Sequence, residues 1–535
     1  MPDPENKNAL AAPAAPSSAP PEKLRPVRRA GSGPALAQSI APPALHDKDS
    51  RVRWGLPASE EEPGWYMVEL NLNTGVGIGE ATTQFFDLFA QVAGAPQASV
   101  HPPVSITKTY VRCWMSVEQW RELIRQDQKA DKDHRLIYKI WPDFPVKPLI
   151  DHSVATIKAD AAGRSYAASG DGICWAVIDS GINAAHLHFG HPTANPQLQT
   201  LTHPSVAELH RDFTVAGSPS SENAKSALVD NFGHGTHVAG IIAGGLLGDQ
   251  PGAVDVYENV FDSTGDDGGP PTQSLKKRQV ADLHAIHGIA PQCKLVSLKV
   301  LDDDGNGRSS DVILALVYIR ESINGDPKLL RIHGVNLSIG YEFDAEMFAC
   351  GQSPLCLEVD RLIKSGVVVV VAAGNTGYGT LASAQRETSV TLSNTINDPG
   401  NSNFAITVGA THRDSPHTYG VSFFSSKGPT GDGRMKPDLV APGERITSCA
   451  AGRYLASNGG EIPDSPPAYI DDSGTSMAAP HVSGAIAAFL SIRREFILQP
   501  EAVKKIFMDS ATSLGRERYF EGSGLVDLMR AIQSV

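Results

Sequence analysis

The chain has 535 residues, of which 41% are hydrophobic and 20% charged, and this length allows about two or three globular domains. Its formal net charge of −13 argues against a general affinity for nucleic acid or anionic membranes, because both require clustered positive charge. No apolar run approaches the roughly 18 residues of a membrane span, so no membrane-spanning segment is predicted.

The N-terminus does not resemble a secretory signal, because Asp3 and Glu5 come early and prolines interrupt the apolar stretch. We therefore expect a cytoplasmic protein, with export by another route or a different translation start as the alternatives. The six cysteines are sparse, which favours buried free thiols over a disulfide framework or a zinc site. A small loop-closing bridge between Cys350 and Cys356 stays open.

The first part of the chain divides into a tail and a small domain. Residues 1–60 are rich in alanine and proline and predict a disordered tail. Residues 61–150 predict strands near 66–72, 99–104, 107–113 and 136–140, and helices over 83–92 and 117–124. This order of strands and helices predicts a small α+β domain of the ferredoxin-like type.

Residues 151–535 have the pattern of an α/β domain with a parallel sheet. Short apolar runs, typical of strands buried on both faces, occur at 173–178, 294–300, 333–339, 367–372 and 404–410. Helical patterns lie between them, over 310–322, 356–364 and 476–495. We expect helices to flank the sheet on both faces. The polar segment 249–279 is interpreted as a surface insertion of unknown function.

Three residues in glycine-containing turns could carry chemistry together. Asp179 ends the first apolar strand, His234 lies between two glycines, and Ser476 precedes a helix that is apolar on most faces. Each has a structural alternative, since aspartate and serine cap turns and helices, and His234 with His237 could bind a metal. No third ligand of suitable spacing accompanies the two histidines, so no metal site is predicted there, and His237 is interpreted as structural.

Taken together, the acid, the imidazole and the hydroxyl are the groups of a nucleophilic triad. A serine hydroxyl needs an imidazole to take its proton, and a buried carboxylate holds that imidazole in one tautomer. The chain order Asp179, His234, Ser476 is one of the known orders of such triads. Asn375, which follows the strand at 367–372, could direct its amide N–H at a developing oxyanion, although an asparagine in a simple turn is the alternative.

On these residues the sequence resembles the subtilase family of serine endopeptidases. The matching blocks are AVIDSGI, GHGTHVAGIIAG, VVVAAGN and GTSMAAPHVSG, which contain Asp179, His234, Asn375 and Ser476 in that order. The resemblance implies a subtilisin-like fold over about 155–535 and hydrolysis of peptide bonds through an acyl-enzyme. It also implies substrate-binding segments on both sides of an extended peptide: Ser338, Ile339 and Gly340; Ala372, Ala373 and Gly374; and Gly305, Asn306 and Gly307.

The resemblance also bears on partners and cofactors. Residues 61–150 are similar to the family's inhibitory propeptide, which implies a zymogen whose N-terminal domain acts as an intramolecular inhibitor or folding chaperone. A cleavage junction near 148–155 is expected; a permanently attached regulatory module is the alternative. Calcium is possible, since it is frequent in the family, and Asp302, Asp303 and Asp304 are candidate ligands that an acidic surface loop explains equally well.

Two other functions compete with peptide hydrolysis. A catalytically silent peptide-binding protein of the same fold would retain the motifs. A dinucleotide-dependent enzyme is disfavoured, because the first strand ends in DSGINAA rather than in a glycine fingerprint.

Overall fold

The computed structural model describes residues 40–41, 43–53, 56–94, 101–105, 108–142, 152–190, 199–215, 221–246, 253–262, 272–280, 283, 286–326, 328–343, 349–382, 387–457 and 468–535. The chain divides into two compact units, Met1–Pro148 and Leu149–Val535. Most of the predicted tail lies outside the described residues, as does the first half of the junction expected near 148–155, through residue 151.

The N-terminal unit is an antiparallel sheet with two main helices. Its elements are β1 (Gly64–Leu70), α2 (Ile78–Ala93), β2 (Val104–Ser105), β3 (Tyr110–Met115), α4 (Val117–Asp127), a 3-10 turn (Lys132–His134) and β4 (Ile137–Pro142). The strand order β2-β3-β1-β4 is that of the predicted ferredoxin-like domain. Buried and half-buried residues alternate along β1, so one face of the sheet meets the core under α2 and α4.

The ordered part of this unit begins earlier than the sequence predicts. A 3-10 turn (Pro43–His46) and the short helix α1 (Lys48–Arg53) fall within the stretch expected to be a tail. The guanidinium of Arg51 is buried and donates to the carbonyls of Leu45, His46, Pro57 and Ala58. One arginine therefore satisfies several backbone acceptors at once, and composition alone does not reveal such long-range bonding.

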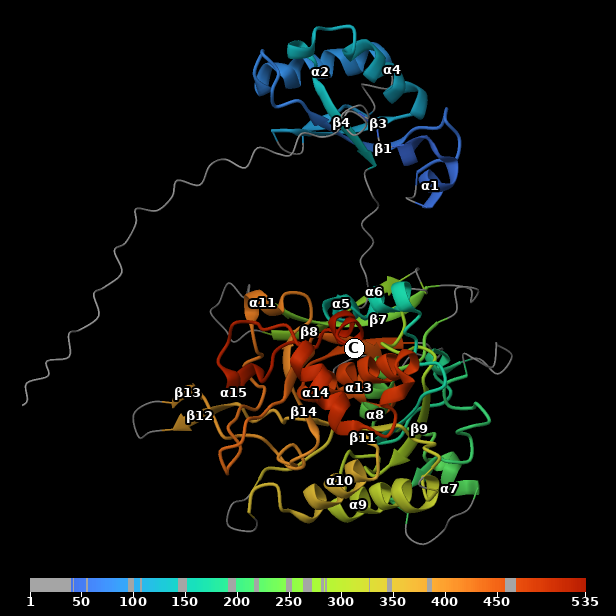
Figure 1. Cartoon of the computed structure of the whole chain (residues 1–535), viewed down its shortest axis with the longest axis vertical. Helices are drawn as coiled ribbons and strands as arrows, with labels where there is room; N and C mark the ends of the chain where they lie inside the picture. Colours follow the sequence, from blue (N-terminus) through green and yellow to red (C-terminus); the bar gives the residue numbers. More distant parts are fainter. Residues whose placement is uncertain are drawn as a thin grey trace, which may run out of the picture. The chain divides into compact units, whose positions relative to one another are not determined.

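The second unit contains a seven-stranded, entirely parallel sheet, which confirms the predicted α/β fold (Figure 1). Its strands are β5 (Cys174–Asp179), β6 (Arg211–Asp212), β9 (Lys294–Lys299), β10 (Gly334–Leu337), β11 (Val368–Ala372), β14 (Ile406–His412) and β15 (Leu439–Glu444). Their order across the sheet is β15-β14-β11-β10-β5-β9-β6. All residues of β5, β9, β10 and β11 are buried, which is why these strands read as continuous apolar runs.

Helices cover both faces of this sheet. One face packs on α8 (His234–Ile242) and α13 (Thr475–Ile492). The other packs on α9 (Ser309–Val317), which continues into a π-helical turn (Tyr318–Ile323), and on α10 (Pro354–Lys364). The remaining helices are α5 (His152–Thr156), α6 (Ala159–Tyr166), α7 (Ser221–Ser226), α11 (Pro416–Tyr419), α12 (Gly452–Ser457), α14 (Pro500–Ser510), α15 (Arg518–Glu521) and α16 (Leu528–Gln533). Short 3-10 turns occupy Leu187–Phe189 and Arg494–Phe496.

The segment interpreted as a surface insertion contains regular structure that reaches the core. It forms a hairpin of β7 (Val254–Asp262) and β8 (Thr272–Val280), joined to β16 (Ile446–Cys449) and β17 (Ala468–Asp472) in the order β16-β17-β7-β8. Val254 and Val256 are buried, because the base of the hairpin is apolar on alternate residues. The hairpin tip, 263–271, lies outside the described residues. A second, two-stranded hairpin, β12 (Tyr378–Ala382) and β13 (Glu387–Thr391), follows β11.

Two further sequence expectations concern composition. All six cysteines are free and buried, so the bridge between Cys350 and Cys356 is not formed. Among the described residues, α13 is the one helix whose length and apolarity would suit a membrane span, and 83% of it is buried inside the unit as a core helix.

Candidate active site

The parallel register brings three strand ends to one level at the carboxyl edge of the sheet. Ile178 of β5 pairs with Leu337 of β10, and Leu337 pairs with Val371 of β11. The residues that follow these three are Asp179, Ser338 and Ala372, respectively. They therefore lie together at the carboxyl edge of the sheet, where open α/β sheets bind ligands. This register, which the motifs alone do not specify, aligns the segments that build the site.

Asp179 and His234 form the innermost contact of the site. The Nδ1 atom of His234 lies 2.8 Å from Oδ1 of Asp179, and Asp179 is 1% exposed. The same carboxylate oxygen accepts the N–H of Ser180 at 2.8 Å. A Cβ atom on Gly235 would lie 2.2 Å from the carbonyl oxygen of Gly181, so only glycine lets the helix that carries His234 approach β5 this closely.

The first turn of α8 is fixed by a second buried aspartate, Asp230. Its Oδ1 accepts the N–H of Gly233 at 2.7 Å, and its Oδ2 accepts the N–H and the hydroxyl of Thr236 at 2.9 and 2.6 Å. These bonds satisfy N–H groups that have no partner within the helix. Asp230 thereby orients the turn that presents His234, a role that sequence reasoning missed, although an Asp-x-x-Gly pattern before a helix is a capping signal.

The surroundings of His234 favour its charged form. Burial by itself lowers the pKa of His234, but the charge and hydrogen bond of Asp179 and the charges of Asp472 and Asp230 outweigh it and raise the pKa to about 9. An imidazolium between carboxylates is the state that a proton-accepting histidine reaches during acyl transfer. The site is therefore built to stabilise that state.

Ser476 lies in the first turn of α13, and its carbonyl has an unusual partner. Pro480 has no N–H to donate to the carbonyl four residues earlier, which is that of Ser476. The hydroxyl of Ser338 donates to this carbonyl at 2.8 Å instead. Ser338 itself accepts from the Asn336 amide at 2.9 Å, which in turn accepts from Ser483 at 2.9 Å. The start of α13 is thus tied to the end of β10.

The hydroxyl of Ser476 donates to the carbonyl of Ser338 at 2.9 Å. Ser476 and His234 line the same cavity. Hydrogen bonds of catalytic groups are often incomplete before substrate binds.

The amide of Asn375 is oriented by Thr475. Its Oδ1 accepts the N–H and the hydroxyl of Thr475 at 2.9 and 3.0 Å, and that hydroxyl accepts the N–H of Gly374 at 3.1 Å. With Oδ1 engaged in this way, the NH₂ group is directed away from Thr475, and it lies 3.3 Å from the Cβ position of Gly474. An N–H donor therefore lies beside the first turn of α13, which contains Ser476.

The cavity of about 580 Å³ gathers most of the residues predicted to bind substrate. It is lined by Gly305, Asn306 and Gly307, by Ser338, Ile339 and Gly340, and by Ala372 and Gly374, together with His234, Asn375 and Ser476. Ala373 is buried and does not line it, and Asp179 lies behind the imidazole. Sequence reasoning missed Phe232, Leu301, Thr376, Asn397 and Thr475, of which Thr475 alone stands in a recognised motif.

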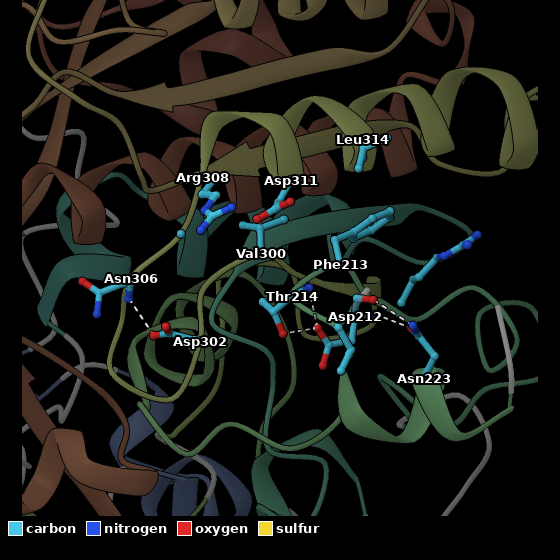
Figure 2. Close-up of a pocket in the computed structure, with 13 residues that line it drawn as sticks. Asp212, Phe213, Thr214, Asn223, Val300, Asp302, Asn306, Arg308, Asp311 and Leu314 are labelled. Carbon is cyan, nitrogen blue, oxygen red and sulfur yellow. Dashed lines mark hydrogen bonds between the residues drawn. The ribbon is translucent and has the colours of Figure 1, made fainter. Parts of the chain in front are cut away.

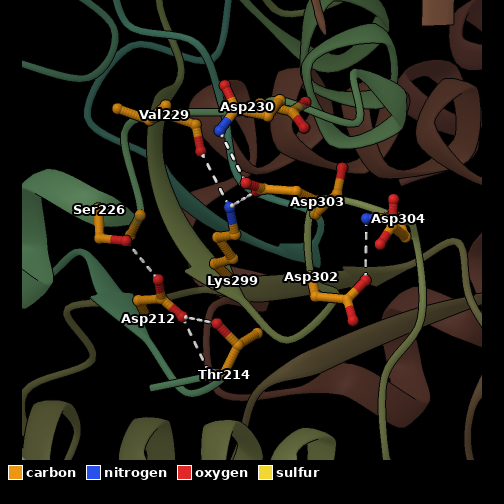
Figure 3. A network of polar contacts seen from close by, with 12 residues as sticks. Asp212, Thr214, Ser226, Val229, Asp230, Lys299, Asp302, Asp303 and Asp304 are labelled. Atoms are coloured by element: carbon orange, nitrogen blue, oxygen red, sulfur yellow. Dashed lines mark hydrogen bonds and ion pairs between the residues drawn. The ribbon is translucent and has the colours of Figure 1, made fainter. Parts of the chain in front are cut away.

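The acidic run 302–304 precedes the Gly305–Gly307 segment that lines this cavity and belongs to a network of polar contacts (Figure 3). Asp302 accepts the N–H groups of Asp304 and Asn306 at 3.0 and 2.9 Å, and Asp303 pairs with Lys299 at 3.0 Å. Asp304 pairs with Arg453. Gly305 follows with φ +80°, and a Cβ there would meet the ring of Phe232 at 2.5 Å. The three carboxylates therefore all contact donor groups of the protein itself, and these contacts hold the bend of the 302–307 loop.

Calcium therefore gains no support from this loop. Among the residues that the structure describes, no three histidine, cysteine or acidic side chains come together as a metal-binding group. The other motif histidines are structural: the Nε2 of His237 lies 3.0 Å from the carbonyl of Ile470, and His481 contacts Met477 and Ser153 at 2.7 Å.

A second cavity, of about 760 Å³, shares Asn306 and Gly307 with the first, and Figure 2 shows residues that line it. Asp212 is the deepest of its carboxylates, and it accepts the N–H and the hydroxyl of Thr214 at 2.8 and 2.6 Å. This carboxylate holds the end of β6 in place and is already satisfied within the protein.

The fold and the cleft together define an α/β protein in which a histidine, a serine and an asparagine line one cavity and a buried aspartate contacts the histidine. The sequence matches the Subtilase family over residues 170–525, and the chain belongs to that family.

Relatives of known name share this region at low identity. The chain is 30% identical over 351 residues to pyrolysin from Pyrococcus furiosus, which covers 56% of this chain and 21% of pyrolysin. It is 28% identical over 377 residues to the serine protease AprX from Bacillus subtilis, covering 69% of this chain and 68% of AprX. It is 29% identical over 328 residues to subtilisin DY from Bacillus licheniformis, covering 61% of this chain and 88% of that protein. The match thus spans about a fifth of pyrolysin's length.

Proposed function

We propose that this protein is a serine endopeptidase that hydrolyses peptide bonds through an acyl-enzyme on Ser476. The observation that carries the proposal is the 2.8 Å contact between Asp179 and His234 at the rim of the cavity that also contains Ser476 and Asn375. Family membership supports the same reaction class.

In the proposed acylation, each of these groups has one role. With the Nδ1–H of neutral His234 donated to Asp179, the lone pair on Nε2 accepts the proton of Ser476 as Oγ bonds to the substrate carbonyl carbon. The carbonyl electrons move to oxygen, and the Asn375 amide and the N–H of Ser476 stabilise the resulting oxyanion. The tetrahedral species collapses, the C–N bond breaks, and the imidazolium gives its proton to the leaving amine.

Deacylation repeats these steps with water. His234 takes a proton from water as its oxygen bonds to the acyl carbon. The Oγ–C bond then breaks, and Oγ recovers the proton from the imidazolium. Asp179 stays ionised throughout and stabilises the imidazolium electrostatically.

The substrate is proposed to be an extended peptide lying between segments 305–307 and 338–340. Both segments expose backbone beside the cavity, so hydrogen bonds to the peptide main chain would dominate and tolerate many sequences. The residue before the cleaved bond would enter the space beside Ala372 and Gly374, where small side chains leave room.

The N-terminal unit is proposed to act as the inhibitor or folding chaperone of the second unit, in a zymogen. Its ferredoxin-like topology supports this assignment. A permanently attached module is the alternative and would leave the chain uncut.

Two measurements test the proposal. A fluorophosphonate probe should label the wild type, and the label should disappear in Ser476→Ala while Ser473→Ala, three residues away, keeps it. Absence of labelling in a folded wild-type protein would favour the alternative of a catalytically silent peptide-binding protein. Intact mass then separates the roles of the N-terminal unit: self-processing removes about 150 residues from the wild type and none from Ser476→Ala.

A further inference from the structure

Asp472 is a carboxylate at the end of β17, four residues before Ser476, that the proposed mechanism does not use. Its own strand is paired on both sides, with β16 at Asp472 itself and with β7 two residues earlier. Asp472 pairs with Ile446 of β16, while β7 of the 254–280 hairpin runs parallel to β17 with Tyr257 opposite Ile470. Just beyond the strand, the N–H of Gly474 donates to the carbonyl of Gly443 at 2.7 Å. The inserted hairpin thus braces the strand that leads to the nucleophile.

Two histidine rings link the helix α8 to the strand β17. The ring of His188 bridges the Gly240 carbonyl (3.2 Å) and the side-chain hydroxyl of Tyr469 (3.1 Å). On the helix itself, the Nε2 of His237 lies 3.0 Å from the carbonyl of Ile470. His234 lies three residues before His237, about 4.5 Å of helix, and Asp472 lies two residues after Ile470, about 6.6 Å of strand. The contact of His237 with Ile470 therefore places Asp472 near the start of α8, where His234 lies.

We propose that Asp472 is a second carboxylate acting on His234, a positioning residue that, with Asp179, holds the catalytic imidazole in its charged form. This inference rests on the proposed function of His234 as the proton acceptor. It also assigns a role to the inserted hairpin, which supports the backbone of Asp472.

Four titratable groups act on or beside His234. They are Asp179 on β5, Asp230 before α8, Asp472 on β17, and the neighbouring ring of His237 on α8. Burial raises the pKa of Asp472 to about 6, while the N–H of Ser473 and the charge of His234 act in the opposite direction. Asp472 is therefore ionised above about pH 6, the range in which His234 is still protonated.

The expected consequence is that the proposed peptidase activity requires a higher pH than it would without Asp472. A base must lose its proton before it can accept one from Ser476, and the charge of Asp472, added to those of Asp179 and Asp230, makes that loss harder. The same charges stabilise the imidazolium formed in the transition state. The proposed peptidase would therefore be less active near neutral pH, whereas in alkaline conditions its His234 would be a stronger base.

Asp472→Asn tests the proposal in two ways. In the pH profile of kcat/KM for peptide-amide hydrolysis, the acidic limb should move down by roughly half to one pH unit. In protein made inactive by Ser476→Ala, NMR titration of the His234 ring should show the same downward shift when Asp472→Asn is added. Because the titration needs no turnover, it still decides the matter if the protein proves to have no peptidase activity.

A matched control removes a negative charge elsewhere. Asp509→Asn, on the exposed face of α14 beside Lys505, should leave both the pH profile and the titration unchanged. Unchanged titration in Asp472→Asn, or an equal shift in Asp509→Asn, would overturn the proposal. If Asp472→Asn does not fold by circular dichroism, Asp472→Ser replaces it. If neither folds, the His234 ring in Ser476→Ala must show a second inflection near pH 6 as Asp472 ionises, and its absence overturns the proposal equally.

Discussion

Ser338 takes the place, at the carbonyl of Ser476, of the backbone N–H that Pro480 lacks. Its hydroxyl donates to that carbonyl at 2.8 Å, and its own carbonyl accepts the Ser476 hydroxyl at 2.9 Å. The residue at the end of β10 therefore holds both the main chain and the side chain of the proposed nucleophile. Ser338 is thus part of the positioning of Ser476 as well as of the wall of the cavity.

The first prediction is that Ser338→Ala destabilises the protein by about 0.5–1.5 kcal/mol, because it removes the hydroxyl that donates to the half-buried Ser476 carbonyl. Urea unfolding, with every variant also carrying Ser476→Ala to prevent self-cleavage, measures this loss. Ser338→Thr keeps the hydroxyl and should retain most of the stability. Equal stability of the alanine and serine forms would show that another donor, such as water, replaces the hydroxyl.

The second prediction concerns the pH dependence of activity. Because the pKa of His234 is raised to about 9, kcat/KM should rise about tenfold per pH unit below that value and level off above it. Below pH 9 the imidazolium is a donor and cannot accept the Ser476 proton, which fits the hydroxyl being directed at Ser338. A profile that is already flat from pH 7 would contradict this environment of His234.

The third prediction is the matching dependence of stability. The folded-state pKa of His234 lies above its ordinary value of 6.5, so its ionisation contributes stability that is full below pH 6.5 and is lost as pH rises through about 9. Unfolding free energies of Ser476→Ala, compared with those of Ser476→Ala/His234→Gln from pH 6 to 10, isolate this component. The difference between the two proteins should shrink over that window; a constant difference would mean that His234 titrates alike in both states.

The sequence suffices to predict the sheet and most of the site because parallel strands and glycine-flanked motifs are local patterns. Asp179 ends a strand that is buried on both faces, and His234 and Ser476 each lie in the first turn of a helix that follows a glycine. Chain order and sheet topology then bring these strand and helix ends to one edge.

The contacts that tune these residues could not be predicted, because they join segments far apart in the chain. Nothing local shows that Asp472 reaches the level of His234, since that depends on how β17 lies along α8. The same holds for Arg51, whose bonds to four carbonyls turn part of an expected tail into ordered structure. The hairpin at 254–280 looks polar because one face is solvated, whereas its base packs on the core.

The fourth prediction concerns the oxyanion donor. Asn375→Ala should lower kcat about 10²–10³-fold with little change in KM, because the amide acts on charge that exists only in the transition state. Thr475→Val removes one of the two bonds that orient this amide and should cause a smaller loss, while Thr475→Ser keeps the hydroxyl and much of the activity. An equal fall in the valine and serine variants would place the role of Thr475 in its methyl group instead.

The last prediction separates the close approach of α8 to β5 from the general effect of replacing glycine. In Gly235→Ala the new methyl group would lie 2.2 Å from the Gly181 carbonyl oxygen and 3.0 Å from Cβ of Asp179, so the helix must move outward. That movement lengthens the contact between Asp179 and His234, and both the stability and the raised pKa of His234 should fall. Gly163→Ala is the matched change: its Cβ position in α6 has no atom within 4 Å, and alanine there should stabilise the protein by about 0.5–1 kcal/mol. Thermal unfolding and NMR titration of His234, both in protein carrying Ser476→Ala, distinguish the two sites, and a Gly235→Ala variant that keeps the wild-type His234 pKa would show that α8 need not lie so close to β5.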